Sequence, residues 1–145
     1  MVTKGRLLAF DYGSRKIGIA VTDPLQITAS PLKTVRYHSK DELGEQLATL
    51  LQEYEISRLI VGIPYTLSGG ESETTSEALE FATWLEREFD LPVEQIDESL
   101  TSRQAMDTLH QMGVKTGHNK ERVDAMAASH LLRHYLDMHS GEKRS

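Results

Sequence analysis

The fold is decided by a stretch near the start of the chain, which reads Leu7-Leu8-Ala9-Phe10-Asp11-Tyr12-Gly13-Ser14-Arg15-Lys16-Ile17-Gly18-Ile19-Ala20-Val21. Its unbroken apolar run over residues 7–10 is typical of a strand buried on both faces. A short polar turn follows, and residues 17–21 are apolar again, so a second strand is expected to return antiparallel to the first. Asp11 is therefore predicted to lie where the first strand ends.

The rest of the chain continues the alternation of strands and helices. Further strands are expected over residues 32–37, 59–63 and 92–97, where apolar runs are bounded by turn residues. Apolar positions at helical spacing predict helices that begin after four capping residues. These caps are Ser39, Thr74, Thr101 and Asn119, and the first three form capping boxes with Glu42, Glu77 and Gln104. The order βββαβαβαα predicts an α/β fold with a mixed five-stranded sheet flanked by helices.

Apolar residues also predict which helix faces pack on the sheet. On the first helix they are Leu43, Leu47, Leu50, Leu51 and Tyr54. On the second they are Ala78, Ala82, Leu85 and Phe89, and on the last Val123, Met126, Ala127, Leu131, Leu132 and Tyr135 or Met138. A chain of 145 residues is expected to form one domain over residues 1–139, with a polar tail over residues 140–145.

The amino-acid composition excludes several kinds of site and limits the possible functions of the protein. The chain has no cysteine, which excludes disulfides, thiolate zinc sites and cysteine nucleophiles. It has neither a transmembrane-length apolar run nor a signal-peptide pattern, so a cytoplasmic protein is expected. The net charge of −6 argues against indiscriminate binding to nucleic acid. However, residues 111–123 carry Lys115, Lys120 and Arg122 against Glu121, a local basic strip that is compatible with a nucleic-acid substrate.

Three carboxylates occupy the ends of predicted elements. Asp11 follows the first strand, Glu98 follows the fifth, and Asp124 lies in the first turn of the last helix. Carboxylates at neighbouring strand ends can converge, and their hard oxygen atoms are suitable ligands for Mg²⁺ or Mn²⁺. Two such ions can activate a water and stabilise the leaving oxygen of a phosphodiester, so the pattern indicates a nuclease. Asp124 also has a simpler interpretation, because acidic residues are favoured in the first turn of a helix.

Four motifs carry a family resemblance. They are residues 10–20, Ile60-Val61-Gly62-Ile63-Pro64, Asp97-Glu98-Ser99-Leu100-Thr101-Ser102 and Val123-Asp124-Ala125-Met126-Ala127-Ala128. In this order they resemble the motifs of the YqgF/RuvX family, relatives of the RuvC Holliday junction resolvases, over residues 6 to 138. The resemblance implies a ribonuclease H-like fold and a nuclease. Its members are regarded as pre-16S rRNA nucleases, with Holliday junction resolution and roles in transcription also proposed.

Two departures from the family pattern are expected to affect substrate binding, whereas the three acidic residues of the catalytic site are kept. Ser99 replaces the usual Arg after the Glu, and the segment after Pro64 lacks the usual Asn. Gly13 is expected to supply a positive φ in the turn and to let a phosphate approach. Candidates for phosphate contacts are Lys16, Arg103, Lys115, Lys120 and Arg122, each of which could also be a solvated surface charge.

The resemblance and the acidic triad together predict a metal-dependent nuclease. Its expected substrate is structured nucleic acid, RNA rather than DNA, most of all precursor 16S rRNA in ribosomal precursor particles. The chain is expected to act as a monomer or weak homodimer. Two alternatives stay open: a catalytically weak module that binds nucleic acid or ribosomes, and a Holliday junction resolvase acting on DNA. A kinase of the actin and sugar-kinase type is disfavoured, because 145 residues cannot supply its two domains.

Overall fold

The computed structural model describes residues 5–13, 16–65, 72–97 and 120–139, and for residues 120–124 it describes the backbone alone. Within these ranges five strands form one mixed sheet in the order β3-β2-β1-β4-β5. The strands are β1 Arg6–Asp11, β2 Lys16–Thr22, β3 Ala29–Arg36, β4 Ile56–Ile63 and β5 Val93–Asp97. β2 pairs antiparallel with both β1 and β3, whereas β4 pairs parallel with both β1 and β5. The predicted mixed sheet with its opening hairpin is confirmed.

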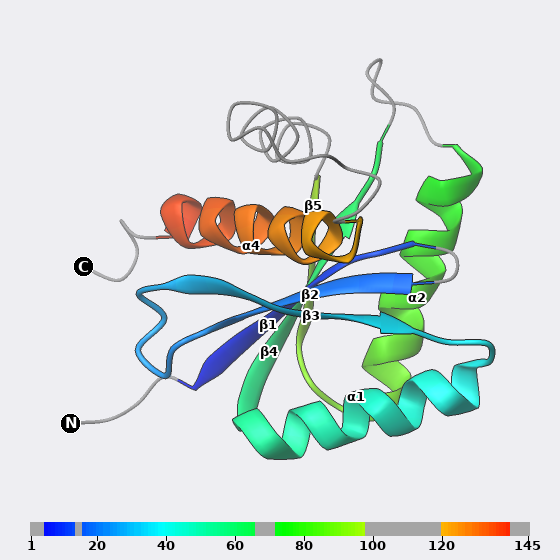
Figure 1. The fold of residues 1–145 in the computed structure, drawn as a ribbon, viewed down its shortest axis with the longest axis horizontal. Coiled ribbons are helices and arrows are strands. Elements are labelled where there is room, and N and C mark those ends of the chain that lie inside the picture. Colours follow the sequence, from blue (N-terminus) through cyan, green and yellow to red (C-terminus); the bar gives the residue numbers. More distant parts are fainter. Residues whose placement is uncertain (1–4, 14–15, 66–71, 98–119, 140–145) are drawn as a thin grey trace.

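Helices cover both faces of the sheet (Figure 1). α1 (Lys40–Tyr54) and α2 (Glu73–Phe89) lie on one face, and α4 (Lys120–His139) crosses the other. β1 is buried by both layers, since Leu8 and Phe10 belong to the core under α1 and α2 while Leu7 and Ala9 belong to the core under α4. This is the reason for its unbroken apolar sequence: alternate side chains enter two different cores.

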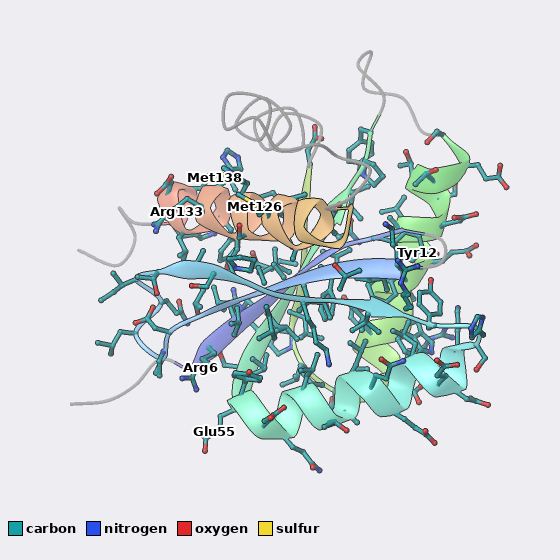
Figure 2. All side chains as sticks on the ribbon, in the orientation of Figure 1. Arg6, Tyr12, Glu55, Met126, Arg133 and Met138 are labelled. Carbon is teal, nitrogen blue, oxygen red and sulfur yellow. The ribbon has the colours of Figure 1, made fainter. Side chains whose placement is uncertain are left out.

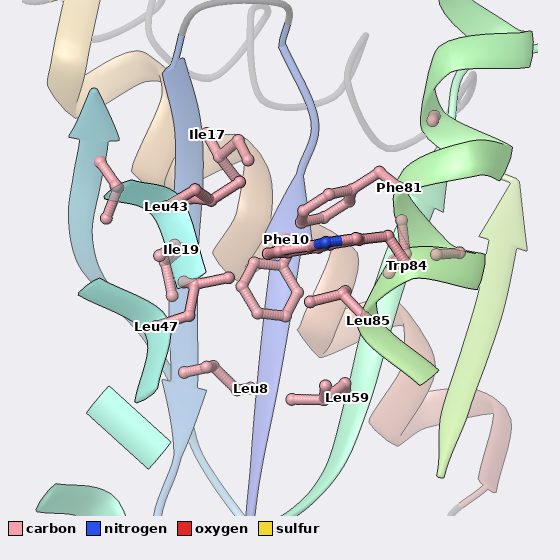
Figure 3. Close-up of a cluster of buried hydrophobic side chains, with 14 of the residues drawn as sticks. Leu8, Phe10, Ile17, Ile19, Leu43, Leu47, Leu59, Phe81, Trp84 and Leu85 are labelled. Carbon is pink, nitrogen blue, oxygen red and sulfur yellow. The ribbon is translucent and has the colours of Figure 1, made fainter. Parts of the chain in front are cut away.

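Aromatic side chains pack against one another within the largely aliphatic core on the α1 and α2 side (Figure 3). Phe10 is fully buried and meets Phe81 of α2 edge-to-face, with ring centroids 5.6 Å apart. Phe81 in turn stacks on Trp84 at 5.9 Å. Such pairs add to the area that they bury, by about 0.5–1.5 kcal/mol each. Neither Phe81 nor Trp84 was among the residues expected on the inner face of α2, although the predicted Ala78, Ala82 and Leu85 are buried there.

The predicted N-cap of α1 is confirmed, but the predicted capping box is not formed. Ser39 is the N-cap and its hydroxyl accepts a hydrogen bond from the Glu42 backbone N–H at 3.2 Å. The Glu42 carboxylate, however, accepts from the backbone N–H of His38 and not from that of Ser39. The predicted inner face is correct, since Leu43, Leu47 and Leu50 are buried.

The predicted start of α2 at Thr74 is wrong. Ser72 is the N-cap, and it exchanges hydrogen bonds with Thr75 in a capping box. Thr75 is fully buried and also donates to the carbonyl of Pro64 at 2.6 Å, which ties the helix to the end of β4. A threonine fills the place that Glu or Gln usually takes, so the expected spacing pointed to the wrong pair.

Two further boundaries differ from expectation. β3 begins at Ala29, earlier than the predicted residue 32, and includes Pro31. Proline is tolerated there because β3 is an edge strand, whose outward N–H groups need no partner in the sheet. On α4, Ala127, Leu131, Leu132 and Tyr135 are buried as predicted, but the stripe also includes Ala125, Ala128 and Leu136, while Met138 is 51% exposed.

Several predictions lie outside the described residues. They concern the helix after Thr101, the loop up to Asn119 and the polar tail over residues 140–145. Among the helices that are described, none is both long and apolar enough to cross a membrane.

Candidate active site

One end of the sheet gathers the segments that carry chemistry. β1, β3, β4 and β5 run in the same direction, so their carboxyl ends lie together with the amino end of β2. α1 and α2 begin at this end, because each follows a strand that ends there, and the first turn of α4 lies there too (Figure 1). Crevices outside the carboxyl ends of strands are the usual ligand sites of α/β sheets.

Asp11 is the central acidic residue of this end. It is half-buried. Because successive side chains of a strand point to opposite faces, Asp11 lies on the same face of the sheet as Leu7 and Ala9, which is the face that α4 covers. In the strand register it is opposite Gly18 of β2 and Gly62 of β4, both of them buried. The carboxylate is therefore flanked on both neighbouring strands by positions without a side chain.

The other two predicted ligands can be placed only in part. Asp124 lies in the first turn of α4, the helix that packs against β1, β2 and β3 on the Asp11 face. Its side chain and the whole of Glu98 lie outside what the structure describes. No cluster of three or more His, Cys, Asp or Glu that could bind a metal occurs among the described side chains, which do not include those of Glu98 and Asp124.

Gly13 is required for a reason other than the predicted one. Its φ is not positive; instead, a Cβ atom built at this position would lie 2.5 Å from the carbonyl oxygen of Lys16. No real Cβ tolerates such a contact with backbone, so only glycine lets the chain turn this tightly between β1 and β2.

Lys16 and Arg36 lie beside the Asp11 position. Lys16 begins β2, two residues from Gly18, and is opposite Arg36 of β3 in the strand register. By strand alternation both lie on the Asp11 face of the sheet. The Lys16 Nζ atom is shielded from solvent, whereas Arg36 is exposed and its carbonyl accepts a hydrogen bond from Gln46 Nε2 at 3.1 Å. Arg36 was not among the predicted contacts, and only the pairing of β2 with β3 brings it here.

The structure does not describe the side chains of the remaining basic candidates. Lys120 and Arg122 lie in the first turn of α4, where the structure describes the backbone alone. Arg103 and Lys115 lie outside the described residues. Asp97, which precedes Glu98 in the third motif, is exposed at the end of β5.

A tyrosine pair supports the same turn from the other face of the sheet. The hydroxyl of Tyr37 donates a hydrogen bond to the carbonyl of Gly13 at 3.2 Å. Tyr12 lies at this end beside α2, with its ring 5.2 Å from that of Phe81 (Figure 2). Burial raises the pKa of the Tyr37 phenol, and the neighbouring Tyr12 hydroxyl and the nearby charge of Glu77 raise it further. Tyr37 therefore stays a neutral donor throughout the physiological pH range.

Comparison with known proteins agrees with this geometry. Residues 5–138 match the family described as "RuvX: Holliday junction resolvase". The chain belongs to the RuvX family. The resemblance of its motifs is thus confirmed over nearly the whole sequence.

Two curated relatives that are similar over most of their length carry the same description. A protein of Koribacter versatilis named "Putative pre-16S rRNA nuclease" is 41% identical, and the match covers 92% of this chain and 87% of that protein. One of Natranaerobius thermophilus with the same name is 38% identical, covering 91% of this chain and 94% of that protein.

Solved structures confirm the fold class. Thermus thermophilus RuvC in complex with a Holliday junction substrate has a TM-score of 0.56 at 15% identity, with 92% of this chain and 96% of that chain covered. The Fowlpox virus resolvase with substrate Holliday junction DNA has a TM-score of 0.58 at 13% identity, covering 92% and 97%. The RuvC-like, ribonuclease H-like fold is therefore shared, although these distant structures indicate nothing about substrate.

Proposed function

We propose that this RuvX-family chain is a metal-dependent nuclease that hydrolyses phosphodiester bonds in precursor 16S rRNA. The observation that carries the proposal is the position of Asp11. A half-buried carboxylate ends the central strand, faces the helix that carries Asp124, and has glycine on both neighbouring strands. The names of the relatives from Koribacter and Natranaerobius support rRNA as the substrate.

Asp11 fits a divalent cation by the chemistry of its donor atoms. A carboxylate is a hard anionic ligand of the kind that Mg²⁺ and Mn²⁺ accept, and the glycines at positions 18 and 62 leave no side chain to compete for the space beside it. We propose Asp124 and Glu98 as the other ligands of two ions. Glu98 comes two residues after Ile96 of β5, which belongs to the core on the α4 side.

The bound ions would supply an activated water and stabilise the leaving 3′ oxygen. The chain's own residues would bind and orient the substrate. Arg36, which is exposed next to the shielded Lys16, is suited to contact the phosphate backbone on the β3 side of Asp11. Lys120 and Arg122, in the first turn of α4, are the proposed contacts on the α4 side, and Lys115 and Arg103 are proposed as further contacts. The bare backbone at Gly13, Gly18 and Gly62 would allow a phosphate to approach closely.

The protein is proposed to act in the cytoplasm on ribosomal precursor particles, as a single-domain monomer or weak homodimer. A second candidate substrate is a four-way DNA junction, which the description of the family itself favours. The shared fold with RuvC is compatible with both substrates and does not distinguish between them.

The test is a direct comparison of the two substrates. Purified protein is incubated with precursor 16S rRNA and with a four-way DNA junction, each with Mn²⁺, with Mg²⁺ and with EDTA. Cleavage of the RNA precursor that requires the metal supports the proposal. Metal-dependent cleavage of the junction alone would replace it with the second candidate, and cleavage that survives EDTA would contradict the metal requirement.

A further inference from the structure

The turn that follows Asp11 is held from the opposite side of the sheet. Tyr37 comes directly after β3, two strands away from β1, and packs against the core under α1 and α2. Its hydroxyl donates to the Gly13 carbonyl at 3.2 Å, a bond between residues 24 positions apart. This bond connects the end of the central strand to the edge of the sheet.

The hydrogen bond to Gly13 restrains the chain on both sides of this residue. Gly13 follows Asp11 by two residues, and its close approach to the Lys16 carbonyl, which leaves no space for a Cβ atom, fixes the start of β2 against it. A hydrogen bond to the Gly13 carbonyl therefore limits the movement of a predicted metal ligand and of a predicted phosphate contact together.

Side-chain packing alone does not hold the turn. Tyr37 borders a cavity of about 70 Å³, which is also lined by Tyr12, Lys40, Glu77 and Phe81. Open space beside the ring means that its position is not determined by close contacts on every side. The hydrogen bond from Tyr37 to the Gly13 carbonyl defines where the hydroxyl lies.

We propose that Tyr37 is a positioning residue for the acidic site: by holding the Gly13 carbonyl it fixes the direction in which Asp11 presents its carboxylate to divalent ions. The inference rests on the proposed function. Tyr37 contacts neither ion nor substrate and acts through the backbone of the turn. Outer partners of this kind typically change metal affinity or activity by about 10- to 100-fold when they are lost.

The test compares Tyr37→Phe with a matched control, Tyr135→Phe. The Tyr135 hydroxyl accepts a hydrogen bond from Arg58 Nη1, also at 3.2 Å, near the carboxyl end of α4. Each variant loses one hydroxyl that takes part in a hydrogen bond and keeps its ring. Mn²⁺ binding to the full chain is measured by titration calorimetry without nucleic acid, below the unfolding temperature of each variant, and kcat and KM are measured on the precursor RNA.

Tyr37→Phe should weaken Mn²⁺ binding by about tenfold and lower kcat by a similar factor at wild-type KM, whereas Tyr135→Phe should leave Mn²⁺ affinity unchanged. If Tyr37→Phe binds Mn²⁺ like the wild type, the inference fails while the proposed function stands. Equal weakening in both variants would also overturn it, because the cause would then be general destabilisation. A wild-type chain that binds no Mn²⁺ would overturn the metal site and this inference together. Weaker binding in Tyr37→Phe alone supports the inference even if no cleaved substrate is found.

Discussion

Asp11 on β1 lies directly opposite Gly18 on β2, in the antiparallel register and on the face of the sheet that α4 covers. A side chain at position 18 would project beside the carboxylate, since cross-strand neighbours on one face have Cβ atoms only about 5 Å apart. On the other side, Gly62 of β4 leaves the same space. The two glycines explain how a phosphate or an ion could reach a half-buried acid at the end of a central strand.

Gly18→Val is therefore expected to impair the site more than the fold. Valine suits a strand, but its branched side chain would occupy the space beside Asp11. We expect Mn²⁺ affinity to fall by at least about tenfold, as when an outer contact of a metal site is disturbed. Calorimetric titration measures the change. Ala29→Val, at the opposite end of the sheet on the same face, is the control and should bind Mn²⁺ normally. Loss of binding in both variants would argue against a local effect.

Arg36→Ala should weaken RNA binding without changing which sequences are bound. Arg36 is exposed and lies beside Lys16 at the site end of β3, so it would neutralise a backbone phosphate rather than contact a base. Its removal should reduce the slope of log affinity against log salt by about one unit, and Lys120→Ala should do the same.

Binding is measured by fluorescence anisotropy at several salt concentrations. Arg87→Ala is the charge-matched control, because Arg87 is exposed in the last turn of α2, away from the site end of the sheet. An unchanged slope in Arg36→Ala, or an equal change in Arg87→Ala, would exclude a specific contact.

Thr75→Val tests how α2 is attached to the sheet near the site. Valine keeps the shape of threonine but removes the hydrogen bonds to Ser72 and to the Pro64 carbonyl, which leaves two part-buried backbone groups without these partners. We expect the free energy of unfolding to fall by about 2 kcal/mol in chemical denaturation. Thr83→Val on the same helix loses only an exposed hydroxyl contact with the Leu79 carbonyl and should change stability by less than about 0.5 kcal/mol. Similar losses in the two variants would refute the role of Thr75.

The contribution of the Asp23 carboxylate to the stability of the fold is expected to depend on pH. Slight burial raises the pKa of this carboxyl, but hydrogen bonds from the backbone N–H groups of Thr28, Ile27 and Leu25 outweigh this and lower the pKa below its ordinary value. Its contribution to stability is therefore complete above the unfolded pKa and is lost as the pH falls through the lower folded pKa.

Asp23→Asn should thus flatten the acid limb of the stability curve. Because the group is mostly exposed, the effect should stay below about 1 kcal/mol. Unfolding in urea between pH 5 and about pH 2.5 tests this, in the range where a carboxyl titrates. A wild-type and an Asp23→Asn curve with the same slope would contradict a contribution of the Asp23 carboxylate to stability.

Local patterns predicted the parts of the fold that local chemistry determines. The apolar run before Asp11 indicated a central strand because its alternate side chains enter two cores. The spacing of Leu43, Leu47 and Leu50 indicated the buried face of α1 because one helical stripe meets the sheet. On α4, by contrast, apolar residues are spread around the helix, so the sequence was compatible with several faces, and Met138 proved exposed while Leu136 is buried.

Contacts between distant segments could not be predicted in this way. The bond from Tyr37 to Gly13 and the pairing of Arg36 with Lys16 depend on the register of β3 with β2, which no local pattern specifies. Thr75 was missed because its role depends on the Pro64 carbonyl, which only the tertiary structure brings within reach. The acidic triad was proposed from element ends and motifs, and the structure places Asp11 on the α4 face but does not test the convergence of all three side chains.

The central claim is that Asp11 binds the ions that a nuclease reaction needs, and the substitution Asp11→Asn tests it most directly. Asparagine keeps the shape but removes the anionic charge, whereas affinity for phosphates comes mainly from basic groups. Wild type and variant are compared on precursor 16S rRNA with Mg²⁺ or Mn²⁺, with folding checked by circular dichroism and RNA binding by anisotropy. The account predicts that Asp11→Asn folds, binds RNA with nearly wild-type affinity and does not cleave it. Equal cleavage by both proteins would contradict the account.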